Sequence, residues 1–291
     1  MKRRTMIAAG SALLSTAVVG SVVAAEAPGS PLRRGAVRVR TLDFSSPADN
    51  LYALVKTLGD LRGVQTYTIS YGQIFGAVGN ELALPLFAFK AARVQSFQPR
   101  GAEAWETRFR GMIYFCDLET GGVIDSWKNP YTGRTVPVIH WATLGESGYT
   151  YTTRGLVARS TFRGEFGADK RDKPLVLPWV VNGEDVWLTL DERVKYVRAS
   201  DGALRSDNAI NRYQTSLGEL QDANFSSARC FTSWHTDQNW MPWMDMDSYP
   251  GRLMWGGAGR KYAGLEQMPA DFVAEVERRV PGALSKPLSR D

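Results

Sequence analysis

The feature that most limits the fold of this chain is a succession of short aromatic and β-branched runs from Leu61 onward. Within Tyr67 to Gly72, apolar residues alternate with polar or small ones, which is typical of a strand with one buried face. Strands that follow one another at such regular spacing favour an antiparallel β-barrel or a barrel-like sandwich. The further strands predicted are Ile74–Phe75, Leu82–Phe89, Val94–Phe97, Trp105–Phe109, Met112–Cys116, Val136–Trp141, Tyr149–Thr153, Val157–Phe162, Val186–Leu190, Lys195–Arg198 and Asn211–Leu217.

Two helices are expected to flank the strands. Ser46 is a suitable N-cap, Pro47 suits the first helical position, and Gly59 ends the apolar period that follows. Near the other end of the chain, Pro269 precedes a segment whose apolar residues recur at helical spacing as far as Val280. The predicted fold is therefore mainly β, with an N-terminal and a C-terminal helix, in a single domain over residues 44–291.

The first 25 residues have the composition of a secretory leader. The paired Arg3-Arg4 precedes a weakly apolar stretch from Ile7 to Val23, a pattern that favours twin-arginine export with cleavage after Ala25 or Ala27. We expect residues 26–43 to form a flexible lead-in, and the mature protein to be periplasmic or secreted. The partner during export is then the twin-arginine translocase. The alternative is an N-terminal anchor, but the stretch is weakly apolar, and we expect no stable membrane span.

Charge and cysteine content exclude several functions. The 35 Lys and Arg residues are interspersed with 30 Asp and Glu residues, so the chain has no basic footprint for nucleic acid. Cys116 and Cys230 could form a disulfide in an oxidising compartment, or Cys116 could be a small buried apolar residue. The spacing of two cysteines and two histidines fits no zinc, haem or iron–sulfur site, and we expect neither a metal nor an organic cofactor.

The first candidate segment runs from Phe115 to His140. Its Thr-Gly-Gly and Asn-Pro-Tyr-Thr-Gly sequences are turn formers, and a hairpin accounts for most of the segment. A hairpin alone does not require Trp127 to alternate with Asp125 and Asn129 on one face, or a histidine at the end of the next strand. Trp127, Asn129 and Tyr131 are therefore candidate substrate-binding residues, with Asn129 and Tyr131 expected to hold polar substituents.

The second candidate segment, residues 233–262, is rich in tryptophan. Indole rings at this density either fill a corner of the core or line a pocket for an apolar or aromatic ligand. In the second interpretation the rings bury the ligand, while basic residues hold its polar substituents. The candidate substrate-binding residues in this segment are Trp234, Trp240, Trp243, Arg260 and Lys261.

Histidine is the natural proton carrier near neutral pH, and both histidines are candidate catalytic residues. His235 lies two residues before Asp237, so in a strand the two side chains share a face and the carboxylate could orient the imidazole. His140 ends an apolar run. For both histidines the alternative is a hydrogen-bonded structural residue.

The two segments also resemble a domain-of-unknown-function family of bacteria and fungi, whose members often carry twin-arginine leaders. The first block is carried by Phe115, Asp117-Leu118, Thr120-Gly121, Trp127, Asn129-Pro130, Thr132-Gly133 and His140. The second is carried by Ser233-Trp234, Trp240-Met241-Pro242-Trp243, Met246, Pro250-Gly251 and Gly259-Arg260-Lys261. The resemblance implies relatives but no reaction. His235-Thr236-Asp237 is less typical of the second block, which marks it as a candidate for the chain's own specificity or as drift.

Two functional hypotheses follow from these residues. The first is an exported enzyme that acts on a small aromatic or hydrophobic compound, such as a plant- or lignin-derived phenolic, by cofactor-independent acid/base chemistry of lyase or isomerase type. The second is a non-catalytic periplasmic carrier of a hydrophobic ligand. The two differ in one respect, because only the enzyme needs an acid or base that reaches the ligand.

Overall fold

The computed structural model describes residues 39–142, 144–159, 164–166, 174–197, 204–246 and 249–289, and residues 37–291 form one compact unit. The predicted leader and most of the predicted lead-in lie outside the described residues. The helices are α1 (Pro47–Leu58), α2 (Leu217–Gln221), α3 (Ala270–Arg279) and the short 3-10 turns η1 (Pro242–Met244) and η2 (Leu265–Gln267). The strands are β1 (Thr66–Ala77), β2 (Leu84–Pro99), β3 (Ala104–Cys116), β4 (Ser126–Lys128), β5 (Thr135–Pro137), β6 (Trp141–Ala142), β7 (Ser147–Thr152), β8 (Gly155–Arg159), β9 (Gly164–Phe166), β10 (Trp179–Asn182), β11 (Asp185–Val197), β12 (Leu204–Ser216), β13 (Phe231–Gln238) and β14 (Arg252–Tyr262).

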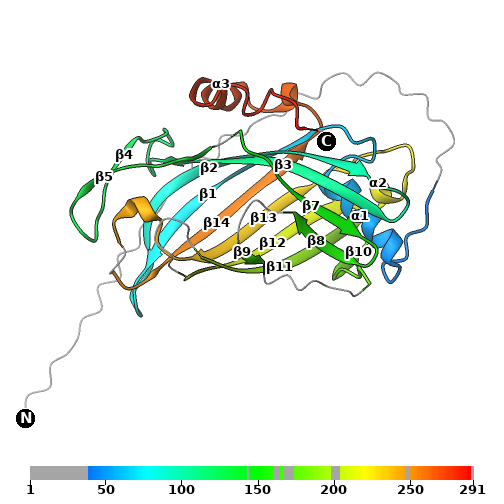
Figure 1. Cartoon of the computed structure of the whole chain (residues 1–291), viewed down its shortest axis with the longest axis horizontal. Coiled ribbons are helices and arrows are strands. Elements are labelled where there is room, and N and C mark those ends of the chain that lie inside the picture. Colours follow the sequence, from blue (N-terminus) through cyan, green and yellow to red (C-terminus); the bar gives the residue numbers. More distant parts are fainter. Residues whose placement is uncertain are drawn as a thin grey trace, which may run out of the picture. The chain divides into compact units, whose positions relative to one another are not determined.

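One large antiparallel sheet dominates the described residues (Figure 1). Its strands follow the order β10-β11-β12-β13-β14-β1-β2-β3-β7-β8, while β6 pairs with β3 and β9 pairs with β11. The mainly β, antiparallel prediction is confirmed. The prediction of closure into a barrel is wrong, because the end strands β10 and β8 do not pair with each other.

The central strands are longer than predicted. Separate strands were predicted at Leu82–Phe89 and Val94–Phe97, but β2 runs through the intervening residues and pairs with β1 and β3 along almost its whole length. Polar residues such as Lys90 do not interrupt a ladder, since their backbone groups bond to both neighbouring strands whatever the side chain does.

Each face of the sheet is covered by a different helix. On one side, Tyr67 and Ile69 of β1 pack with Phe272 and Val276 of α3 (Figure 1). On the other side, Phe97 of β2 packs with α1. We call these sides the α3 face and the α1 face. Side chains alternate along a strand, and residues directly opposite on neighbouring strands share a face, so the register assigns each strand residue to one of them.

Both predicted helices are confirmed. The Ser46 hydroxyl accepts a hydrogen bond from the backbone N–H of Asp49, Pro47 opens α1, and the N–H of Gly59 bonds to the carbonyl of Val55. The C-terminal helix buries Phe272 and Val276, as the helical spacing predicted. None of the helices in the described ranges is long and apolar enough to cross a membrane.

The segment after α3 belongs to the core of the α3 face. Arg110 of β3 is only 1% exposed, and its guanidinium donates hydrogen bonds to the carbonyl oxygens of Gly282, at 3.4 Å, and of Lys286. A buried charge is tolerated where acceptors surround it. The side chains of Ala283, Leu284 and Leu288 join the same buried cluster.

Candidate functional site

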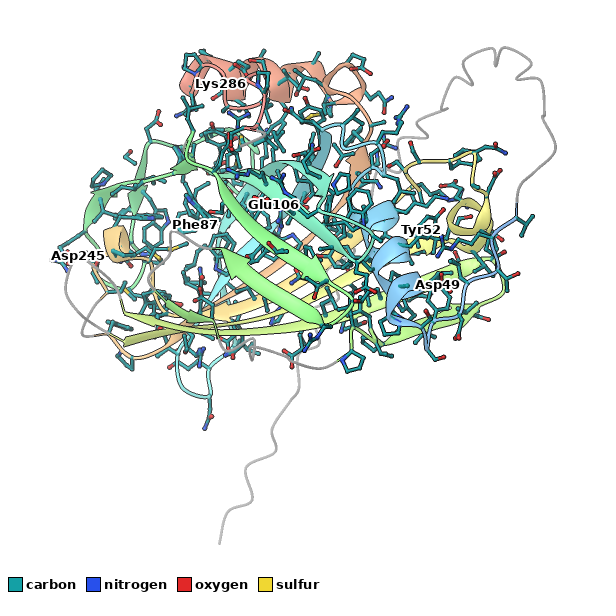
Figure 2. All side chains as sticks on the ribbon, turned by 45° about the vertical axis from the view of Figure 1, so that its right-hand side comes forward. Asp49, Tyr52, Phe87, Glu106, Asp245 and Lys286 are labelled. Carbon is teal, nitrogen blue, oxygen red and sulfur yellow. The ribbon has the colours of Figure 1, made fainter. Side chains whose placement is uncertain are left out.

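The predicted tryptophans gather on the α1 face, where they pack against each other and against phenylalanines. Trp127 of β4 and Trp243 of η1 meet the ring of Phe87 at centroid distances of 4.6 and 5.7 Å. Figure 2 places Phe87 well away from α1, which is marked by Tyr52. We call this group the aromatic cluster; its rings are Phe87, Phe89, Phe115, Trp127, Trp234, Trp240, Trp243 and Trp255. Its close ring contacts are those of a packed core.

Two glycines allow the rings to lie against the sheet. Gly72 of β1 and Gly257 of β14 are paired, and they are flanked on the same face by Phe89 of β2 and Trp234 of β13. An added Cβ at Gly257 would lie 2.7 Å from Phe89 Cζ and 3.0 Å from Trp234 Cε2. The glycines therefore provide the space into which these two rings pack, 5.1 Å apart between centroids.

Asn129 and Tyr131 form the turn that supports the aromatic cluster. Asn129 is fully buried; its amide donates to the carbonyl of Met244 at 2.9 Å, and its Oδ1 accepts from the backbone N–H of Tyr131 at 2.9 Å. The Tyr131 ring contacts Trp240, whose indole N–H donates to the carbonyl of Tyr249. The polar groups of Asn129 are thus engaged within the protein.

His235 and Asp237 share a face, as predicted, but it is the α3 face. Their neighbour Trp234 points to the α1 face, because adjacent residues of a strand point to opposite sides. The Asp237 carboxylate forms an ion pair with Arg252, and the described residues show no contact between it and His235. The predicted couple is therefore separated by the sheet from the aromatic cluster.

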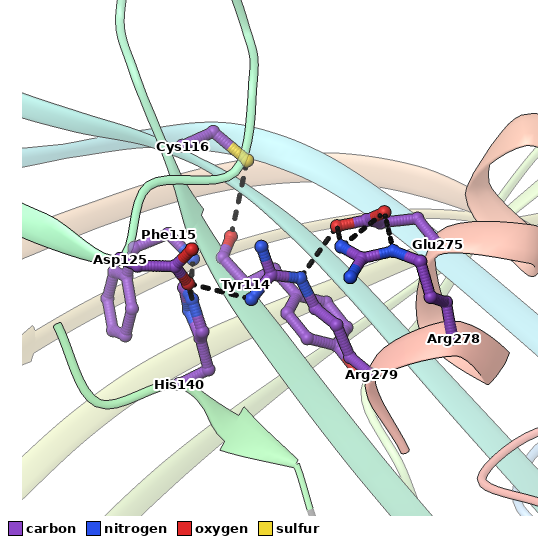
Figure 3. Close-up of polar contacts among 8 residues, drawn as sticks. All are labelled: Tyr114, Phe115, Cys116, Asp125, His140, Glu275, Arg278 and Arg279. Atoms are coloured by element: carbon purple, nitrogen blue, oxygen red, sulfur yellow. Dashed lines mark hydrogen bonds and ion pairs between the residues drawn. The ribbon is translucent and has the colours of Figure 1, made fainter. Parts of the chain in front are cut away.

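His140 lies between β3 and α3 in a polar network (Figure 3). Its Nδ1 accepts a hydrogen bond from the backbone N–H of Phe115 at 3.2 Å, and its Nε2 lies 3.6 Å from Asp125 Oδ1. Asp125 also pairs with Arg279 of α3 at 2.8 Å. Burial, reinforced by the Arg279 charge, lowers the pKa of His140, so the imidazole is neutral at pH 7. His140 therefore has a structural role in this geometry, because its hydrogen bond to Phe115 links the segment after β5 to β3.

Arg260 and Lys261 are neighbours that point to opposite faces. Arg260 stacks over the Tyr262 ring on the α3 face and lines a hollow of about 300 Å³ together with Arg229, Phe231 and Gln267. Lys261 lies on the α1 face, where its ammonium donates to the carbonyls of Lys56 and Gly59 at the end of α1, both at 2.9 Å.

The cysteines are free, and each is buried on a different face of the sheet. Cys116 lies opposite Ala88 on the α3 face, whereas Cys230 lies beside Lys261 on the α1 face. Of the two alternatives that the sequence left open, the disulfide is absent, because the sheet separates the two thiols. Burial raises the pKa of the Cys230 thiol to about 11, so it remains protonated.

Sequence reasoning missed a charged group on the α1 face, between the aromatic cluster and α1. Arg93 of β2 is half-buried, and its guanidinium lies 3.8 Å from the ring centroid of Phe109 of β3. The Phe109 ring in turn stacks on Tyr149 of β7 at 5.4 Å. The sequence did contain an indication of this, since Arg93 is an even number of residues from Phe87 and Phe89. On a continuous strand, that spacing predicts that its side chain points to the same face as theirs.

Among the described residues, nothing fills the space beside Arg93. Gly111 of β3 lies directly opposite Arg93, and a Cβ added to it would meet no atom of the described chain within 4 Å. At this point β3 changes its outer neighbour: β7 pairs with residues up to Phe109, and β6 pairs with Met112 and Ile113. Gly111 therefore lies at a gap between two ladders. Arg93, Phe109, Gly111 and Tyr149 together form what we call the Arg93 site.

One further titratable group lies on the α1 face. Asp207 of β12 is opposite Gln238 of β13, on the same side as Trp234. Burial raises the pKa of its carboxyl to about 6, and the positive charge of Arg252 partly opposes the shift.

Comparison with known proteins identifies the family of this chain but no relative of known activity. The sequence profile of a family described as "Protein of unknown function (DUF1838)" matches residues 63–290. No curated protein matches the chain. Among solved structures, the chain is similar to a DUF1329 family protein from Desulfovibrio piger, with 9% identity and a TM-score of 0.23, over 80% of this chain and 98% of that one. A likeness at this level supports no conclusion about the present chain.

Proposed function

This chain belongs to the DUF1838 family of proteins of unknown function, as its sequence blocks predicted, and we propose that it binds a small hydrophobic or aromatic molecule as a non-catalytic carrier. The observation that carries the proposal is the open space over Gly111, which adjoins the stacked rings of Phe109 and Tyr149 on the α1 face. Aromatic walls next to unfilled space suit an apolar ligand with flat or flexible parts.

A carrier fits the chemistry of this site better than a histidine-dependent enzyme does. His235 lies on the α3 face, away from the Arg93 site, and the Nδ1 of His140 is engaged by the backbone N–H of Phe115. The same proposal includes export by the twin-arginine route to the periplasm or the exterior. A carrier is useful in such a compartment because hydrophobic compounds must pass through water there.

The second candidate is the enzyme of lyase or isomerase type, and one observation favours it. The Asp207 carboxyl, with its pKa raised to about 6, has an acid strength suited to proton transfer near neutral pH, and it lies on the α1 face. In that case Asp207, and neither histidine, would be the acid/base group. Product formation from an aromatic substrate that is lost in an Asp207→Asn variant would favour the enzyme over the carrier.

Titration with a neutral fluorescent probe, N-phenyl-1-naphthylamine, tests ligand binding directly. We expect saturable fluorescence enhancement with the wild type and its loss in a Gly111→Val variant, because the added side chain occupies the open space. The matched control is Gly256→Val, since Gly256 also has no described atom within 4 Å of an added Cβ but faces the α3 side. Absence of binding in the wild type, or equal binding by both variants, would refute the proposal.

A further inference from the structure

Arg93 is held among uncharged side chains on the α1 face. Its direct neighbours across the ladder are Thr68 of β1 and Gly111 of β3, and along its own strand the same face carries Ala91 and Gln95. The Gln95 amide is engaged with the carbonyl of Leu58. None of these groups can neutralise a guanidinium.

The charge of Arg93 has no counterpart within the described chain. Its Nε atom is buried and has no hydrogen-bond partner, and no ion pair is formed with a described acid. Other arginines of this region differ, because Arg100 and Arg108 both pair with Glu106. An inward-facing charge without a partner is costly, so a ligand anion that pairs with it would gain binding energy.

The orientation of the guanidinium leaves it able to bind a ligand. Its carbon lies 3.8 Å from the Phe109 centroid, so the ring contributes a cation–π contact without using a donor. The N–H groups of a guanidinium radiate within its plane in a fork that matches a carboxylate. Gly111, whose added Cβ would meet no described atom within 4 Å, lies directly opposite Arg93 in the ladder, so unfilled space is available beside Arg93.

We propose that Arg93 binds the carboxylate of an amphiphilic ligand whose apolar part lies against the Phe109 and Tyr149 rings. This inference rests on the proposed carrier function and specifies its ligand class. A single negative charge is favoured over a dianionic phosphate, because Lys261, which lies in the same cross-strand row as Arg93, is committed to the carbonyls of α1. An aromatic or fatty carboxylic acid meets these requirements.

Competition with matched pairs tests the assignment. trans-Cinnamate and decanoate are compared with their methyl esters for displacement of N-phenyl-1-naphthylamine from the full chain. We expect at least one acid to displace the probe at a roughly tenfold lower concentration than its ester does, because a charge-assisted bidentate contact contributes about that much affinity. In Arg93→Met this preference should vanish while the affinity for the neutral probe stays within about twofold.

Two further variants keep the test informative. Arg93→Lys retains the charge without the fork and should give an intermediate preference. Arg212→Met is the matched control, since Arg212 belongs to the same sheet but faces the α3 side, and it should leave the preference unchanged. Equal displacement by acids and esters in the wild type, or an unchanged preference in Arg93→Met, would overturn the inference while the carrier proposal stands. Failure of the neutral probe to bind would instead overturn the carrier proposal.

Discussion

Exchanging two strand glycines for alanine should give effects of opposite sign. Gly111 and Gly72 both lie in long central strands and both face the α1 side, and neither has a positive φ. At Gly111 an added Cβ meets nothing described within 4 Å. At Gly72 it would collide with the carbonyl oxygen of Gly256 and lie 2.6 Å from Phe89 Cζ and 2.7 Å from Gly257 Cα.

The magnitudes follow from these neighbours. Glycine in a strand costs about 0.5–1 kcal/mol of stability relative to alanine, so Gly111→Ala should stabilise by up to about that amount. Two of the atoms that crowd Gly72 belong to the backbone of β14, which cannot turn away as a side chain can. Overpacking of this kind costs roughly 1–3 kcal/mol or more, so Gly72→Ala should destabilise. The two variants should then differ by about 1–4 kcal/mol.

Urea unfolding followed by tryptophan fluorescence measures both variants in one assay, because the aromatic cluster lies over Gly72. The expected result is a midpoint above the wild type for Gly111→Ala and well below it for Gly72→Ala, with equal m-values. Destabilisation of Gly111→Ala by more than about 1 kcal/mol would refute the reasoning, since it would mean that the space over Gly111 is filled. Such a result would also remove the basis of the carrier proposal.

Three other outcomes are expected. Burial lowers the pKa of His140 below its ordinary value of 6.5, so the unfolded chain binds more protons than the folded chain as the pH falls through 6.5. The unfolding free energy should therefore decrease between pH 7.5 and 5.5, and it should decrease less in His140→Asn. Burial lowers the pKa of Lys56 and of Lys261 from 10.5 to about 8, so between pH 8 and 9.5 the unfolded chain holds more protons than the folded chain. The unfolding free energy should therefore rise over this range, and the rise should be smaller in Lys56→Met. His235→Ala should leave probe affinity within about twofold, because its imidazole faces away from the Arg93 site; a tenfold loss would place the ligand on the α3 face.

The parts of the fold that depend on local chemistry were predictable from the sequence. Ser46, Pro47 and Gly59 specify the ends of α1 through contacts within a few residues, and the structure has those ends. The length of β2 was not predictable, because pairing with β1 and β3 carries the strand through a polar stretch. Barrel closure depends on whether β10 and β8 meet, and no local pattern contains that information.

The candidate site was harder to predict than the fold. Trp234 and His235 are adjacent in sequence and were grouped for that reason, yet a strand directs them to opposite faces. Arg93 carried a usable signal in its alternation phase, but it lay between the two predicted strands Leu82–Phe89 and Val94–Phe97 and was assigned to neither. The open space at Gly111 arises where β3 passes from β7 to β6, a change of partners that only the assembled sheet reveals.

The bonding of Arg110 bears on the order in which the protein can fold. Its guanidinium is enclosed on the α3 face and finds acceptors in the carbonyls of Gly282 and Lys286, which lie 172 and 176 residues further along the chain. Until that distant segment is in place, β3 carries a charge over an apolar layer without acceptors, and the sheet cannot reach its final packing. Packing on the α3 face is therefore a late step of folding, and a substitution that loosens the segment after α3 should also destabilise β3.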